Sequence, residues 1–210
     1  MRAGPSCPRC GHELQAPGLW SSQWACDRHG AVPPLQPVVQ PTADVLAAVA
    51  GHSNVPVWLP WPLPRGWLVT GIAQAGDERS GARATAMACT GPAPLGGVGE
   101  LVVVAEEPGV GLGARFAGLE GPDPGSEMSP GRPADAKVHA AGHPTAMWAV
   151  ASASDRAAYV GEALGLWLWA VLWPESAGFL LIDEFVLTDV RDAGHDIDVP
   201  FGALSPRLAG

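Results

Sequence analysis

The chain has 210 residues, of which 47% are hydrophobic, and a formal net charge of −9 at pH 7. The hydrophobic fraction is ample for a folded core and excludes an intrinsically disordered chain. The acidic balance argues against binding to nucleic acid or to anionic membranes, since both need a basic surface.

Cysteine and histidine residues gather near the N-terminus with a repeated spacing. Cys7 and Cys10 are three positions apart, and Cys26 and His29 repeat this spacing after fifteen intervening residues. Two such pairs are typical of a tetrahedral zinc site, because each tight turn delivers two ligands. Four protein ligands leave no position for water, so the sequence predicts a structural Zn²⁺ and not a catalytic one.

The sequence offers two alternatives to this ligand set. His12 is a rival fourth ligand, but the repeated spacing favours His29. The cysteines could instead form disulfides, which the absence of a secretory signal in residues 1–5 disfavours. Gly11 and Gly30 each follow the second ligand of a pair, where the backbone must turn tightly. We therefore expect a β-hairpin clamped by zinc.

Charge and composition divide the chain into three parts. Residues 1–36 are predicted to form the zinc ribbon, with a net charge of +1 from three arginines against two acidic residues. Three thiolates and one Zn²⁺ bring this part near neutrality. Residues 37–66 are expected to be a Pro/Trp-rich connecting segment, and residues 67–210 a β-rich domain. Together, residues 37–210 carry a net charge of −10.

The connecting segment contains a short helix-like run, residues 45–49, followed by a stretch rich in proline and tryptophan, residues 55–67. Proline at this density excludes a helix or a central strand. One interpretation is a ligand segment that displays Trp58 and Trp61 to a partner protein. We favour the other, an irregular segment that buries both rings, because so much exposed apolar surface would promote aggregation.

The rest of the chain has a β-like pattern. A pair of strands, 166–173 and 179–183, is expected to form a hairpin across the turn at 174–178, while residues 155–164 fit neither strand nor helix. Further strands are expected at residues 67–73, 83–90, 100–105, 137–141 and 145–151. The predicted fold class is therefore α+β: a small N-terminal zinc ribbon followed by a mainly antiparallel β domain with few short helices.

One strand in this series has two distinct faces. Residues 83–90 place Arg83, Thr85, Met87 and Cys89 on one side and alanines on the other. Cys89 has no activating motif beside it, so we expect a buried, reduced thiol.

A glycine-rich stretch, residues 109–114, matches the G-x-G-x-x-G/A pattern of dinucleotide-binding loops. Glu106 and Glu107 would meet an approaching pyrophosphate, and Gly118 would cut short any helix that follows. A turn-forming loop is the favoured interpretation.

Acidic residues crowd the C-terminal end, together with Arg191 and His195. Such groups could hold a cation or act in acid/base catalysis, but their spacing fits no known loop and favours a solvated surface. They are Asp183, Glu184, Asp189, Asp192, Asp196 and Asp198.

Several segments together resemble an uncharacterised actinobacterial protein family, a domain of unknown function. The resemblance rests on Cys-Pro-Arg-Cys-Gly at residues 7–11, the Pro/Trp run at 56–64, Gly-Asp-Glu-Arg-Ser-Gly at 76–81 and Gly-Leu-Trp-Leu-Trp-Ala-Val-Leu-Trp-Pro at 165–174. It covers essentially the whole chain and implies no activity.

These observations favour a soluble, cytoplasmic zinc-binding protein that acts as a protein-interaction or regulatory module. The longest apolar run, residues 164–173, is too short to cross a bilayer as a helix. We expect a protein partner and no binding to nucleic acid or membrane. The sequence leaves open an enzyme with a pocket in the β-rich domain that uses the C-terminal acids, and it does not settle the partner, substrate or oligomeric state.

Overall fold

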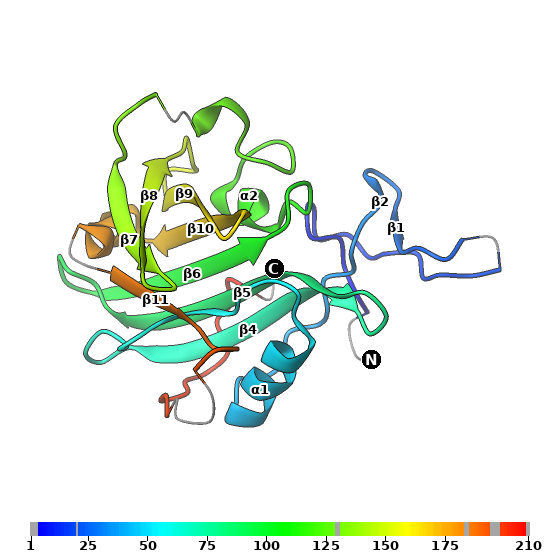
Figure 1. The fold of residues 1–210 in the computed structure, drawn as a ribbon, viewed down its shortest axis with the longest axis horizontal. Helices are drawn as coiled ribbons and strands as arrows, with labels where there is room; N and C mark the ends of the chain where they lie inside the picture. The colour runs from blue at the N-terminus through cyan, green and yellow to red at the C-terminus, as the bar shows by residue number, and fades with distance from the viewer. Residues whose placement is uncertain (1–3, 20, 129–130, 183–184, 194–197, 209–210) are drawn as a thin grey trace.

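The computed structural model describes residues 4–19, 21–128, 131–182, 185–193 and 198–208. Its dominant feature is a nine-stranded curled sheet in the order β3-β11-β7-β8-β9-β10-β6-β5-β4 (Figure 1). Its strands are β3 (Trp58–Pro60), β4 (Leu68–Asp77), β5 (Gly81–Pro92), β6 (Val98–Glu106), β7 (Ala136–Ala140), β8 (His143–Ala149), β9 (Ala157–Ala163), β10 (Leu166–Trp173) and β11 (Phe185–Asp189).

The remaining elements are short. Two-residue strands pair as a separate antiparallel hairpin near the N-terminus. The elements outside the nine-stranded sheet are β1 (Ala25–Cys26), β2 (Gly30–Ala31), α1 (Ala43–His52), α2 (Leu112–Ala117) and the 3₁₀ helices η1 (Gly125–Glu127) and η2 (Glu175–Leu181). Within the described residues, all pairs in the large sheet are antiparallel except β11 with β7. The prediction of a mainly antiparallel β fold with few short helices is confirmed.

The curl of the sheet creates one core inside and another outside. Met87 and Cys89 of β5 lie in the inner cluster, which also contains Trp58 and Leu168. The alanines of β5 lie in the outer cluster, together with α2 and Trp169. The two-faced pattern predicted for this strand is confirmed, and Cys89 is a buried free thiol. β3 also contacts β5 and β6 across the curl, although they are not its neighbours in the sheet.

The edge formed by β4 is covered by the proline-rich chain that precedes α1. Leu35 bridges Ala75, and Val39 bridges Ile72 further along the same edge. The backbone N–H of Gln36 also donates to the carbonyl of Gln74 at 2.9 Å. Proline is tolerated in such a position because an edge strand needs only part of its hydrogen-bonding groups.

The Pro/Trp-rich segment contributes both a helix and a strand. Thr42 caps α1 by accepting a hydrogen bond from the N–H of Val45 at 3.2 Å. Trp58, in β3, is only 2% exposed, and Trp61 is partly buried against the inner core. The structure therefore supports the interpretation in which this segment packs against the body.

The predicted hairpin between residues 166–173 and 179–183 is wrong. β10 instead pairs with β9 on one side and with β6 on the other, and most of the expected second strand forms η2; residue 183 lies outside the described residues. The hairpin turn lies earlier, where Leu164 and Gly165 both have positive φ, 57° and 76°. This combination is the geometry of a type I′ turn, which matches the twist of the flanking strands.

Among the described residues, no helix has both the length and the apolar character that a membrane crossing needs.

Close packing between α2 and the sheet predicts a contrast between two glycines. A Cβ atom at Gly113 would overlap the indole ring of Trp169, which is fully buried. Gly51, in α1, has nothing within 4 Å of an added Cβ. We expect Gly113→Ala to destabilise the protein by about 1–3 kcal/mol through overpacking, and Gly51→Ala to be neutral or to stabilise it by up to about 1 kcal/mol. Chemical denaturation measures both, and equal effects would contradict this packing.

Candidate metal centre

Two tight turns present the four predicted ligands to one another. In the first, the N–H of Gly11 donates to the carbonyl of Cys7 at 2.8 Å. In the second, which joins β1 to β2, Cys26 is the register partner of Gly30. Both glycines have positive φ, 74° and 67°, as expected for backbone that turns immediately after a ligand pair.

The ligand atoms converge at a single point between these turns. One atom each from Cys7, Cys10, Cys26 and His29 lies within 4.8 Å of the others. The Sγ atoms of Cys10 and Cys26 are 3.7 Å apart. The Nδ1 atom of His29 lies 3.5 Å from Cys7 Sγ and 3.6 Å from Cys26 Sγ. These four residues could hold a metal ion.

The distances between ligand atoms can be compared with those of a zinc tetrahedron. Zn–S bonds of about 2.3 Å and Zn–N bonds of about 2.0–2.1 Å place two sulfurs about 3.8 Å apart and a sulfur and a nitrogen about 3.6 Å apart. The structure gives 3.7 Å for Cys10 and Cys26, and 3.5 Å and 3.6 Å for Nδ1 of His29 with Cys7 and Cys26. All the ligand atoms lie within 4.8 Å of one another. A disulfide would need about 2.05 Å, and all four cysteines are free. These three distances match a tetrahedral ion that Nδ1 of His29 faces.

Backbone N–H groups of both turns stabilise thiolates, but only at Cys26 do such contacts outweigh the effect of burial on the pKa. Burial raises the pKa of Cys7 to about 11, against the effect of backbone N–H groups at Arg9 and Cys10. Burial opposes ionisation of Cys26 as well, but there the N–H groups of Arg28 and His29, with the neighbouring thiols, outweigh it and lower the pKa. Each knuckle thus points backbone donors at its first sulfur. A bound cation adds the charge that the buried Cys7 needs in order to ionise.

His12, the rival ligand, points elsewhere. Its Nδ1 atom lies 3.3 Å from the carbonyl oxygen of Cys10, and it does not join the cluster of four.

The first knuckle also contacts the sheet domain. The guanidinium of Arg9 donates to the carbonyls of Gly109 and Val110, the latter at 3.3 Å. Asp123 holds the same loop by accepting from the N–H of Gly109 at 2.7 Å. These contacts could not be predicted from residue spacing, because they join positions 100 and 101 residues apart. In Figure 1 the loop before α2 lies beside the N-terminal chain, from which β1 and β2 project.

The glycine-rich stretch does not form the site of a dinucleotide. A short helix, α2, begins after Gly111 and ends at Gly118, so the loop prediction is wrong for residues 112–114, while the expected early end is confirmed. Glu106, fully buried, accepts from the N–H of Leu112 at 2.7 Å and from that of Gly113 at 3.2 Å. The carboxyl group thus occupies the N–H groups that would face a phosphate.

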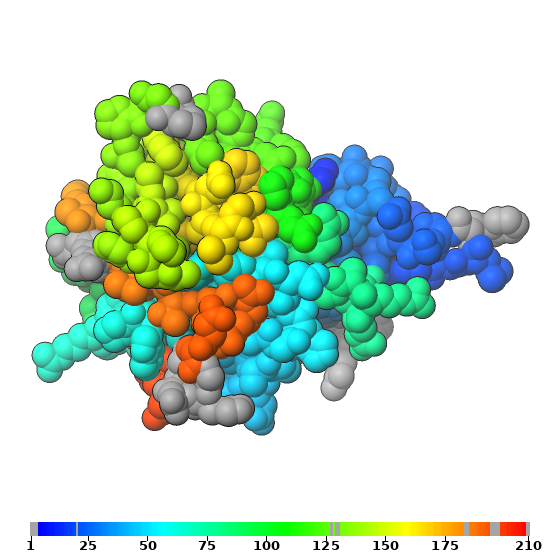
Figure 2. Space-filling view, viewed as in Figure 1, coloured from blue at the N-terminus to red at the C-terminus, as the bar shows by residue number. Residues whose placement is uncertain are grey.

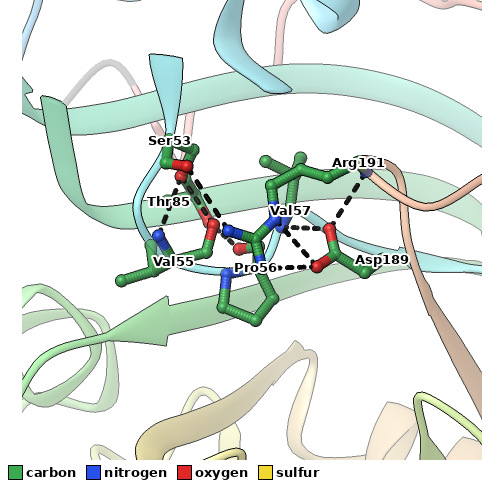
Figure 3. Close-up of polar contacts among 7 residues, drawn as sticks. All are labelled: Ser53, Val55, Pro56, Val57, Thr85, Asp189 and Arg191. Atoms are coloured by element: carbon green, nitrogen blue, oxygen red, sulfur yellow. Dashed lines mark hydrogen bonds and ion pairs between the residues drawn. The ribbon is translucent and has the colours of Figure 1, made fainter. Parts of the chain in front are cut away.

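The C-terminal acids are brought together only in part. Asp189 is 2% exposed and accepts from the N–H of Val57 at 3.1 Å and from Nη2 of Arg191 at 2.7 Å (Figure 3). Arg191 also reaches the carbonyl of Ser53. This ion pair joins the end of β11 to the chain before β3, so it is a structural contact. Asp192 and Asp198 are exposed. The remaining predicted members, Asp183, Glu184, His195 and Asp196, lie outside the described residues.

A groove of about 1170 Å³ lies between the N-terminal segment, residues 36–39, α1 and the β4–β5 turn. The N-terminal segment contributes Pro17, Ser22 and Trp24, which precede β1. Two of the polar side chains that line the groove bond within their own segments: Asp77 accepts from the N–H of Ser80 at 2.8 Å, and Nδ1 of His52 lies 3.0 Å from the carbonyl oxygen of Ala48.

Comparison with known proteins gives a family. A model described as "Family of unknown function (DUF6758)" matches residues 1–208, so the chain belongs to this family. The match confirms the predicted resemblance to an uncharacterised family over the whole chain. No curated protein and no solved structure matches the chain.

The buried carboxyl group of Glu106, which precedes the loop that Arg9 contacts, predicts a pH dependence of stability. Burial raises the pKa of Glu106 from 4.5 to about 8. Between these values the folded protein keeps a proton that the unfolded chain releases, so the contribution of Glu106 to stability is full below pH 4.5 and is lost as the pH rises through 8. From pH 6 to 8, wild-type protein should therefore lose roughly 1 kcal/mol of stability per pH unit relative to Glu106→Gln. Denaturation of both proteins at several pH values measures this difference, and a constant difference would contradict it.

Proposed function

We propose that this member of the DUF6758 family is a zinc-binding protein whose Zn²⁺ is structural. The proposed ligands are Cys7, Cys10, Cys26 and His29, and the observation that carries the proposal is the convergence of their ligand atoms within 4.8 Å. All four corners of the tetrahedron come from the protein, so no position remains for a substrate or a reactive water. The site therefore serves to hold the chain in shape.

The N-terminal segment has a physical need for such an ion. Its own buried cluster consists of Cys7, Leu14, Cys26 and Val32, two of which are proposed ligands. So few apolar side chains cannot offset the conformational entropy of about thirty ordered residues. Zinc binding contributes about 10–16 kcal/mol in small zinc-finger peptides, enough to order such a segment. We therefore propose residues 1–36 as a zinc ribbon, 37–66 as the segment that connects it and 67–210 as the β-rich domain.

We propose that the zinc-stabilised segment forms part of a protein-interaction or regulatory module. The support is the groove that the N-terminal segment lines with Pro17, Ser22 and Trp24, because the shape of this wall depends on the segment being ordered. The near-neutral ribbon and the acidic remainder favour a protein partner over nucleic acid. Thiolate ligands imply a reducing compartment, the cytoplasm in this proposal.

Single histidine substitutions test which histidine is the fourth zinc ligand. We expect one Zn²⁺ per wild-type chain and greatly weakened binding in His29→Gln, because an amide is a poor zinc ligand. His12→Gln should keep full zinc content, since His12 faces the Cys10 carbonyl. Native mass spectrometry of the purified full chain measures the metal content of the three proteins.

Wild-type protein without bound metal would overturn the proposal. Retention of zinc in His29→Gln together with loss in His12→Gln would assign the fourth ligand to His12 instead.

A further inference from the structure

The body of the protein places a cation against the first cysteine knuckle. Arg115 belongs to α2, and a Cβ atom added at Gly11 would lie 2.9 Å from its Nη2 atom and 3.2 Å from its Cζ atom. Gly11 directly follows Cys10 and closes the knuckle turn through its bond to the Cys7 carbonyl. The guanidinium therefore packs on the turn that carries two of the proposed ligands.

The position of Arg115 beside the knuckle brings its charge near the thiolates of Cys10 and Cys7. Burial lowers the pKa of Arg115, and the thiolate charges of Cys10 and Cys7 act in the opposite sense. A Zn²⁺ ion with three thiolates and one neutral imidazole has a net charge of −1. A guanidinium stays protonated in proteins, so it can balance that charge at every accessible pH. Because the surroundings are partly buried, the attraction is stronger than it would be in water.

Arg115 is held in this place by the rest of α2. The helix starts at N–H groups bound by Glu106, and Gly113 packs against Trp169. The other arginine of this contact, Arg9, is directed at the carbonyls of Gly109 and Val110. The two arginines thus have different partners: Arg9 joins the knuckle to the loop, and Arg115 joins the helix to the knuckle.

We propose that Arg115 is a positioning residue of the metal centre, whose charge stabilises the zinc–thiolate cluster and links metal affinity to the folded sheet domain. This inference rests on the proposed function, since it presumes that the cluster binds zinc. It assigns to a residue of the β-rich domain a role in a site formed otherwise by residues 7–29.

The test measures zinc affinity in matched arginine variants of the full chain. Residues next to the ligands typically change metal affinity by about 10–100-fold when mutated, so we expect Arg115→Gln to weaken zinc binding within that range. Arg115→Lys keeps the charge and should recover most of the loss. Arg156→Gln is the control, because Arg156 also contacts α2, through the carbonyl of Phe116 at 2.8 Å, while its side chain pairs with Asp155. Competition with a chromophoric chelator measures the affinities.

The outcomes separate this inference from the proposed function. Wild-type protein that binds no zinc would end the proposed function itself. If the wild-type protein binds zinc and Arg115→Gln binds it with the same affinity, the charge of Arg115 has no role. An equal loss of zinc affinity in Arg115→Lys and Arg115→Gln would overturn the role of the charge as well. Weakening in Arg115→Gln with recovery in Arg115→Lys and no change in Arg156→Gln would support it. Co²⁺ absorption spectra of each variant show whether the tetrahedral site persists, so a folding defect is not mistaken for an electrostatic effect.

Discussion

The contact between the first cysteine knuckle and α2 joins the two unlike parts of this protein. On one side are short turns with few apolar side chains, and on the other a sheet with cores on both faces. Arg9 reaches the loop before α2, and Arg115 packs beneath Gly11. Because Glu106 and Trp169 fix α2, a disturbance at the metal centre can reach the sheet through this helix. A second connection runs through Leu35, which bridges both Ser6 and, in β4, Ala75.

The sequence predicted what depends on local spacing and alternation. The ligand pairs were recognisable because a tight turn requires two ligands at a separation of three, and the structure brings Cys7, Cys10, Cys26 and His29 together. Likewise, the alternation in residues 83–90 predicted which face of β5 holds Met87 and which holds alanines. Both signals are short-range, so neither needs knowledge of the remaining chain.

Features that depend on the folded arrangement of the chain were missed. The β9–β10 hairpin turns at Leu164 and Gly165, and leucine at a positive φ gives no turn signal in the sequence. Glu106 looked like an obstacle to a phosphate, whereas it binds the start of α2 inside the protein. Asp189 looked like part of a solvated acidic surface, but it is buried and accepts from the N–H of Val57, which precedes β3. For both acids, burial and the bonded N–H groups decide the role, and neither can be read from residue spacing.

The proposed metal centre is a closed site with three sulfur ligands and one nitrogen ligand around zinc. X-ray absorption spectroscopy at the zinc K-edge of the purified full chain measures this coordination, because it counts ligand types and gives bond lengths. We expect three sulfur atoms at about 2.3 Å and one nitrogen at about 2.0–2.1 Å, with no oxygen. A shell that contains water or carboxylate oxygen, or fewer than three sulfur atoms, would contradict it.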